Sequence, residues 1–137
     1  MAASAEFITV ANNKFTTFVN ADGTTTKNCW SSSAAKGGLV RGILVATDDV
    51  AAVDVQLWYK PAGGSEYLQT TIRVPATSGS VQGVAPVNVL NPTVLPFLDE
   101  EPNRAWFFQQ NAELRIKVVA AVTAAKTVWV SVYGGDY

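Results

Sequence analysis

The side chains that could perform acid, base or metal chemistry are few in this chain. Its acidic residues gather in two groups, namely Asp48, Asp49 and Asp54, and then Asp99, Glu100 and Glu101. Neither group has the alternating ligand spacing and the turn glycine of a calcium loop. Turn residues flank both groups, so we expect both to lie in solvated loops.

Catalysis and cofactor binding also lack their usual residues. The chain contains no histidine, which is the commonest general base and the commonest metal ligand in proteins. No serine, threonine or cysteine can therefore be given a histidine partner. The stretch KGGLVRG lacks the GxxxxGK[ST] spacing that cradles phosphate, so it is typical of a turn. The sequence predicts a protein that is not an enzyme and has no catalytic residue, cofactor or metal.

Charge, cysteine usage and the N-terminal sequence indicate the compartment. Ten basic against eleven acidic residues leave a formal charge of -1, which gives no reason to expect nucleic acid or an anionic membrane as a partner. Cys29 is the only cysteine; this excludes an internal disulfide, leaves an intermolecular one open, and favours a small, partly buried apolar role. MAASAEF has no signal-peptide pattern, and no apolar run approaches the roughly 20 residues of a membrane helix. We expect a soluble, non-secreted protein.

A period of two in the hydrophobic pattern predicts the elements. The 137 residues fit one domain. Residues 53–60 and 67–74 alternate like half-buried strands around the turn PAGGSE, which predicts a hairpin. Residues 14–20 and 27–30 predict a second hairpin around Asp22-Gly23.

The later segments follow the same rule with one exception. Residues 39–47 are apolar on both faces and belong in a sandwich interior. Residues 114–122 keep the strand period through their alanines, so we predict that they pair with 127–133. Residues 84–108 carry four prolines and predict a long excursion, with one short helix starting at Asn91-Pro92 and Leu95 facing inward. The overall prediction is an all-β antiparallel β-sandwich, with an N-terminal arm at 1–13 and one domain at 14–137.

The aromatic residues are the remaining candidates for function. The core accounts for about half of them, including Phe107 or Phe108. Trp58 and Trp129 sit on the face opposite the aliphatic row of their strands, where a monomer would place water. Two interpretations remain for them, a place in a subunit interface or a place in the core. The glycine pair before Tyr137 indicates a flexible tail that reaches a neighbour or frays. The predicted contact residues are Trp58, Pro92, Trp106, Trp129, Tyr133 and Tyr137.

The order of several segments suggests a family. TTFVNADGTTTK, GLVRGILVAT, VDVQLWY, YLQTTIRVPATSG, PVNVLNPTVLPFLDEE and LRIKVVAAVTAAKTVWVSVYGGDY together resemble the small structural proteins of tailed-bacteriophage virions, and most of all the capsid decoration (cement) proteins. The resemblance implies a sandwich of jelly-roll type, often trimeric, that sits on the outer capsid surface and ties neighbouring copies of the major capsid protein together. It also implies assembly in the host cytoplasm and an N-terminal arm whose Phe7 and Ile8 contact the capsid.

Two alternatives stay open at this point. A head-tail connector, neck or tail protein would share the fold and the near-neutral charge. A carbohydrate-binding β-sandwich would use Trp58, Trp106 and Trp129 as a stacking platform, with Asp54, Gln56 or Gln109 bonding the sugar hydroxyls.

Overall fold

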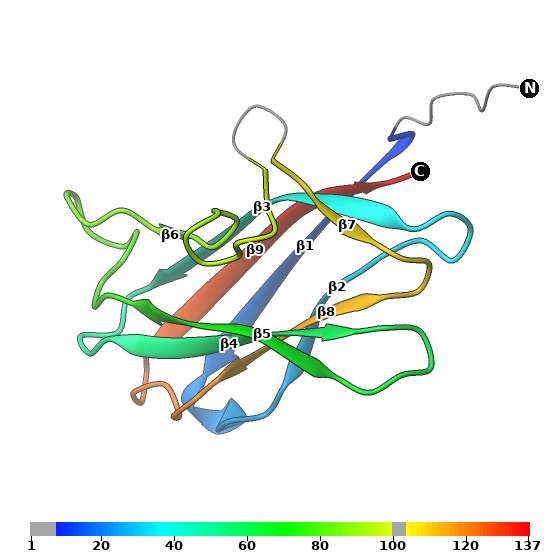
Figure 1. Ribbon diagram of the computed structural model, residues 1–137. Helices are drawn as coiled ribbons and strands as arrows, with labels where there is room; N and C mark the ends of the chain where they lie inside the picture. Colours follow the sequence, from blue (N-terminus) through cyan, green and yellow to red (C-terminus); the bar gives the residue numbers. More distant parts are fainter. Residues whose placement is uncertain (1–7, 100–103) are drawn as a thin grey trace, which may run out of the picture.

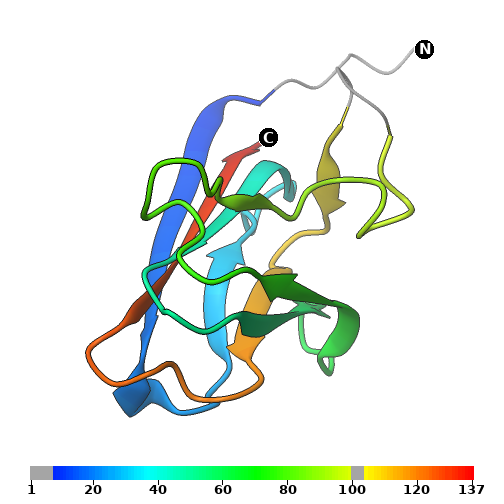
Figure 2. The same cartoon turned by 90° about the vertical axis from the view of Figure 1, so that its left-hand side faces the viewer.

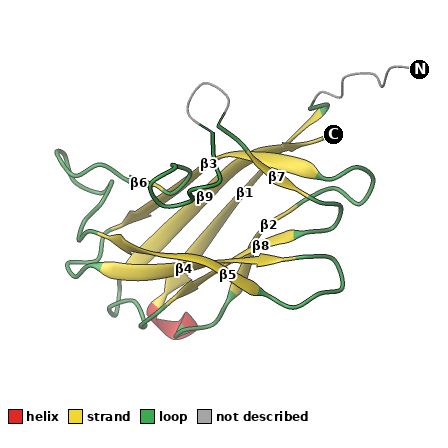
Figure 3. Cartoon of the chain, viewed as in Figure 1, coloured by secondary structure: helices red, strands yellow, loops and turns green. Residues whose placement is uncertain are grey.

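The computed structural model describes residues 8–99 and 104–137 and is a sandwich of two sheets (Figures 1 and 3). One sheet, called the β1 sheet below, has the strand order β1-β9-β3-β6, with β7 also paired to β3. The other, called the β2 sheet, has the order β2-β8-β4-β5. The strands are β1 Val10–Val19, β2 Lys27–Ser31, β3 Gly38–Thr47, β4 Val53–Lys60, β5 Tyr67–Val74, β6 Val87–Asn88, β7 Trp106–Phe108, β8 Glu113–Val118 and β9 Thr127–Asp136. All pairs of these strands are antiparallel, so the predicted all-β antiparallel sandwich is confirmed.

The strand pairs are nested along the chain. β4 pairs with β5, β3 with β6, β2 with β8 and β1 with β9, so each pair encloses the one before it. Further pairing of β3 with β9 and of β4 with β8 joins these pairs into the two sheets. Figure 1 shows β1, β9 and β3 crossing behind β4 and β5. Consecutive strands therefore often belong to opposite sheets.

One of the predicted hairpins is confirmed. β4 and β5 pair from Val53 opposite Val74 to Tyr59 opposite Tyr67. Their bounds are those predicted from the alternation, and the turn between them is closed by the Gly64 N–H donating to the Pro61 carbonyl at 3.1 Å.

The other two predicted hairpins are wrong. A turn does form at Asp22-Gly23, where Gly23 has a φ of 57°, but it follows the 3₁₀ turn η1 (Asn20–Asp22) and carries the chain from the β1 sheet to the β2 sheet. Likewise β8 ends at Val118, short of the predicted residue 122, and β9 lies in the other sheet. Alternation determines which face of a strand is buried, but it leaves the pairing partner open.

Trp30 organises one end of the core. Its indole is fully buried and its Nε1 donates to the Asn12 carbonyl at 2.8 Å, which ties β2 to β1. A Cβ on Gly134 would lie 2.6 Å from the Leu39 carbonyl oxygen and 3.0 Å from the Trp30 ring. Only glycine fits there, because the ring lies directly against the backbone of β9. The predicted flexible glycine pair is therefore wrong: both glycines lie within β9.

β6 and β7 both pair with β3, and the described residues between them, 89–99 and 104–105, lie at that side of the sandwich (Figure 2). After β6, the Asn91 side chain accepts hydrogen bonds from the N–H groups of Thr93 and Val94 at 3.0 and 3.1 Å, and turns follow. The short helix predicted at Asn91-Pro92 is not formed, because the Asn91 side chain takes the backbone donors into a turn instead. Leu95 faces inward as predicted and is 1% exposed.

Strand pairing begins inside the segment predicted as an arm. β1 starts at Val10, opposite Asp136, and the Thr9 N–H donates to the Asp136 carbonyl at 3.0 Å. Residues 1–7 lie outside the described part. Within the described part, the chain has no helix of the length and apolarity that a bilayer crossing requires.

Candidate interaction surface

On the outer face of the β1 sheet, strands β1 and β9 carry three aromatic side chains that are open to solvent. Phe15 is 64% exposed, Trp129 41% and Tyr133 40%. In the strand register Phe15 lies opposite Ser131, midway between Trp129 and Tyr133 along β9. The Phe15 and Tyr133 rings meet edge to face, with centroids 5.8 Å apart. Phe15, Trp129 and Tyr133 together are called the aromatic face below.

The positions in register around the aromatic face carry no charge. They are occupied by uncharged residues, three of them polar and three apolar or glycine: Asn13, Thr17, Ser131, Gly42, Leu44 and Ala46. The nearest charged residue of β3 is Arg41, which is exposed in the bulge between Val40 and Gly42. A solvated face of an antiparallel sheet normally presents polar side chains, whereas here three rings are exposed among the polar ones. Neighbouring exposed rings mark an interaction site more often than a solvated surface.

The outer face of the β2 sheet has the opposite character. Arg115 donates to Glu113 and to Glu66, each at 3.0 Å. Arg73 forms a double hydrogen bond with Asp54 at 2.9 and 3.1 Å, and this bond lowers the pKa of the Asp54 carboxyl below its usual value. Such ion pairs are typical of a face that remains in water. The β1 sheet is thus the candidate contact surface.

The three tryptophans of the predicted stacking platform do not share a surface. Trp129 belongs to the aromatic face, whereas Trp58 is half-buried on the β2 sheet, in register with Leu68 and Arg115. Trp106 is only 6% exposed and belongs to the core between the sheets. The platform prediction is wrong because the three rings belong to three different strands, β4, β7 and β9, which place them in three different environments.

The remaining predicted contact residues lie apart from the aromatic face. Ile8 is half-buried and its side chain lies over Gly135 of β9, where a Cβ would overlap with it. Pro92 is half-buried in the turns after β6. The Tyr137 N–H donates to a backbone carbonyl before β3 at 3.3 Å, so this residue continues the packed end of β9. Phe7 lies outside the described residues.

Phe15 and Phe107 are among the exposed rings that were missed as contact candidates. Phe15 alternates with Phe18, which is fully buried, so it must point outward, and this signal was present in the sequence. Phe107 is 65% exposed while Phe108 is 4% exposed. The sequence left open which of that pair faces the core, because both neighbours in WFF are aromatic.

Asp49 is a structural carboxylate. It is 2% exposed and accepts hydrogen bonds from the Ala51 N–H at 3.0 Å, the Thr123 N–H at 3.0 Å and the Thr123 hydroxyl at 2.8 Å. Burial raises the pKa of this carboxyl, but the bonds from Ala51 and Thr123 outweigh it, so the pKa lies below its usual value. Asp48 accepts the Thr127 N–H at 2.8 Å. The solvated-loop prediction is therefore wrong for Asp49, which holds the loop after β8 to the loop after β3. It is also wrong for Asp54, which lies within β4.

The other groups with potential chemistry are isolated. Cys29 is fully buried, and this burial raises the pKa of its thiol to about 11. Asp99 is exposed, whereas Glu100 and Glu101 lie outside the described residues. No cluster of three or more potential metal ligands occurs in residues 8–99 and 104–137.

No protein-family model matches the chain, and no curated protein matches it. Among solved structures, it is similar to a chain of the capsid asymmetric unit of cyanophage Pam1, with a TM-score of 0.43 and 17% identity over 100% of this chain and 93% of that chain. It is also similar to a chain of infectious bursal disease virus strain Gt, with a TM-score of 0.32 and 16% identity over 100% of this chain and 36% of that one. It is similar as well to a chain of infectious bursal disease virus strain Gx, with a TM-score of 0.31 and 13% identity over 93% of this chain and 29% of that one. These values are too low to assign the chain to a family.

Proposed function

We propose that this chain is a non-enzymatic virion structural protein, and more closely a decoration protein that binds the outer surface of a phage capsid and bridges its subunits. The aromatic face carries the proposal. Its three exposed rings lie together without an ion pair among them, while the outer face of the β2 sheet carries the ion pairs of Arg73 and Arg115. That difference suits a protein held by one face against a larger assembly.

The strand topology supports the same role. The orders β1-β9-β3-β6 and β2-β8-β4-β5 arise when one long antiparallel ribbon of four nested strand pairs is wrapped into two sheets. We interpret this arrangement as a jelly roll, an architecture that recurs in viral capsid and lectin domains. It agrees with the resemblance of the sequence to phage decoration proteins.

The size of the aromatic face indicates how such binding would work. Covering the exposed parts of its three rings removes on the order of 250 Å² from water, which contributes about 6 kcal/mol at ~25 cal/mol/Å². Association costs roughly 4–15 kcal/mol in lost freedom of motion. One patch of this size is therefore weak by itself, and stable attachment needs further contacts or several linked copies. A trimer that contacts several copies of the major capsid protein meets that need.

The first experiment is the stoichiometry of this chain against the major capsid protein in purified virions, measured by quantitative peptide mass spectrometry. A ratio near one to one supports a decoration protein that covers the lattice. A few copies per particle would move the chain to the neck or tail. Complete absence from virions would overturn the proposal.

The second experiment tests the surface. Phe15→Ala and Tyr133→Ala should each weaken binding to capsids that lack the chain by about tenfold or more, because a contact worth about 1.4 kcal/mol changes the affinity tenfold. Tyr67→Ala is the matched control, since Tyr67 is 59% exposed on the β2 sheet. Co-sedimentation measures binding, and thermal melts verify that each variant is folded. Equal binding by all three variants would place the contact elsewhere.

A further inference from the structure

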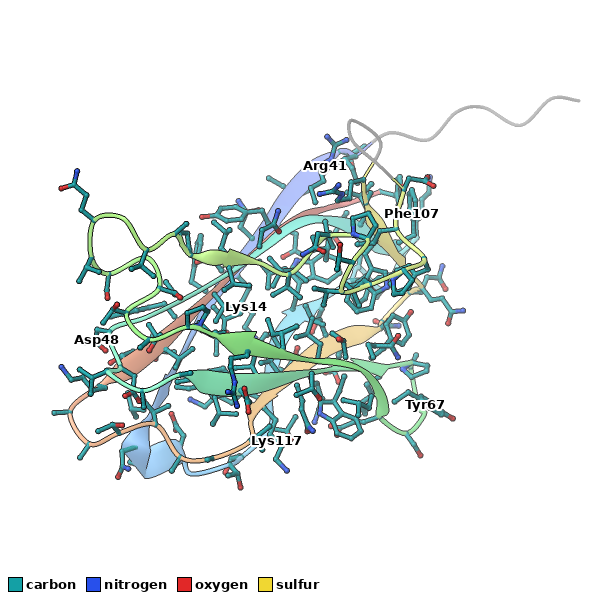
Figure 4. The ribbon with its side chains drawn as sticks, turned by 60° about the vertical axis from the view of Figure 1, so that its left-hand side comes forward. Lys14, Arg41, Asp48, Tyr67, Phe107 and Lys117 are labelled. Atoms are coloured by element: carbon teal, nitrogen blue, oxygen red, sulfur yellow. The ribbon has the colours of Figure 1, made fainter. Side chains whose placement is uncertain are left out.

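A second aromatic site lies at another part of the molecule, where the β4–β5 hairpin meets β7. It is an open pocket of about 380 Å³ lined by Tyr59, Gln69, Phe97, Trp106, Phe107 and Gln109. This volume is within the roughly 300–1,000 Å³ typical of small-ligand sites. In Figure 4, Phe107 and Tyr67 lie at the same end of the sandwich, opposite the end that carries Asp48.

The rings of this pocket rest on a packed base. Tyr59 and Trp106 are stacked, with centroids 6.1 Å apart and 27° between the ring planes. The ring centroid of Phe108 lies 5.0 Å from that of Tyr59 and 4.9 Å from that of Trp106. Phe97 meets Trp106 edge to face at 5.4 Å, yet it is 55% exposed, and Phe107 is 65% exposed. The pocket is therefore preformed, and its outer rings offer apolar surface to a ligand.

The polar groups of the pocket are neutral and partly unused. The Tyr59 hydroxyl oxygen accepts the Gln109 N–H at 3.3 Å, which orients the phenol and leaves its own O–H available as a donor. The Gln69 Nε2 donates to the Tyr67 carbonyl at 3.1 Å, so its Oε1 remains available as an acceptor. The Gln109 side chain supplies a further amide. No lining residue is charged.

We propose that this pocket binds a neutral saccharide. A sugar ring has C–H faces that pack on aromatic rings, and hydroxyl groups that both donate and accept hydrogen bonds. A pocket that combines exposed rings with amide and phenol groups matches both properties. A charged ligand would find no opposite charge in the lining. A purely apolar ligand would displace water from the amide groups without giving them a new hydrogen-bond partner, which costs free energy.

The test uses an array of neutral glycans, followed by titration with cellohexaose, maltohexaose, xylohexaose and chitohexaose. Binding of at least one of these glycans is expected, with a saturable change in tryptophan fluorescence from Trp106. Phe107→Ala and Gln109→Ala should each weaken that binding at least tenfold. Phe15→Ala is the matched control, because Phe15 has nearly the same exposure as Phe107, 64%, but is not among the residues that line the pocket, and it should leave glycan binding unchanged.

Three outcomes would overturn the proposal. They are the absence of saturable binding to any of these glycans, glycan binding that Phe107→Ala and Gln109→Ala leave intact, and binding of a proline-rich peptide in the pocket of a protein that binds none of the glycans. The last outcome would identify a peptide groove, since proline-rich segments also dock on aromatic surfaces. None of these results depends on whether the aromatic face binds a capsid, so the two proposals succeed or fail separately.

Discussion

Replacing Asp49 with alanine is expected to lower the free energy of unfolding by about 3 kcal/mol. The carboxylate accepts two backbone N–H bonds and one hydroxyl bond at 2.8 to 3.0 Å while 2% exposed. A hydrogen bond to a charged group contributes roughly 1.5–3 kcal/mol, and bonds that share one group are not additive. The alanine variant would also leave the N–H groups of Ala51 and Thr123 without their acceptor.

The pH dependence gives this prediction a second measurement. The pKa of Asp49 is lowered in the folded state, so the unfolded chain, with a carboxyl pKa of about 3.9, binds more protons in the interval between the two values. The contribution of the carboxylate is therefore complete above about pH 5 and is lost as the pH falls through the folded-state pKa. The stability difference between wild type and Asp49→Asn should be largest near neutral pH and shrink below about pH 4.

Urea unfolding followed by tryptophan fluorescence, at several pH values, measures both effects. Asp99→Asn is the control, because Asp99 is exposed and its replacement should change stability by less than about 0.5 kcal/mol. The reasoning is refuted if Asp49→Ala is as stable as wild type to within about 0.5 kcal/mol. It is also refuted if the difference between wild type and Asp49→Asn does not change from pH 7 to pH 2.

Two further predictions concern the core. Cys29 should resist alkylation by iodoacetamide at pH 8 in the native protein and react fully in denaturant, because burial raises its thiol pKa to about 11; rapid native labelling would show that β2 opens. Gly134→Ala should destabilise the protein by about 2 kcal/mol or more, since its Cβ would lie 2.6 Å from the Leu39 carbonyl oxygen and 3.0 Å from the Trp30 ring. Gly64→Ala, whose Cβ meets Pro61 at an ordinary 3.4 Å, should be nearly neutral in the same thermal melt, and equal melting temperatures for the two variants would contradict the packing argument.

The sequence predicts which face of each strand is buried more completely than it predicts which strands pair with each other. The alternation of residues 53–60 and 67–74 predicted the bounds of both strands and their pairing as a hairpin. This succeeded because a short glycine-rich turn brings the two neighbouring strands together. Around Asp22-Gly23 the same kind of turn connects strands of different sheets. The local sequence does not distinguish such a connection from a hairpin turn. Pairing in a nested ribbon depends on segments more than 100 residues away, as with Val10 and Asp136, which no local pattern specifies.

The candidate surfaces were predictable in part. Trp129 and Tyr133 follow from alternation against the buried valines of β9, and both are exposed as that pattern requires. Trp106 was misplaced because its strand has three residues, which is too short for a period to show. The pocket beside it joins side chains from β4, β5 and the β6–β7 segment, so it exists only once the fold has formed.

The position of β9 also affects the order in which the protein can form. β9 lies between β1 and β3, so the β1 sheet lacks its second strand until residues 127–136 have been synthesised. Until then β1 has no partner along its length, and Phe15 is displayed on an unpaired strand that can pair with other chains. Contacts between segments so distant in sequence make folding slow. The nascent chain is therefore expected to depend on chaperones until β9 is added, and substitutions in β9 should reduce soluble yield more than equally destabilising substitutions in the β4–β5 hairpin.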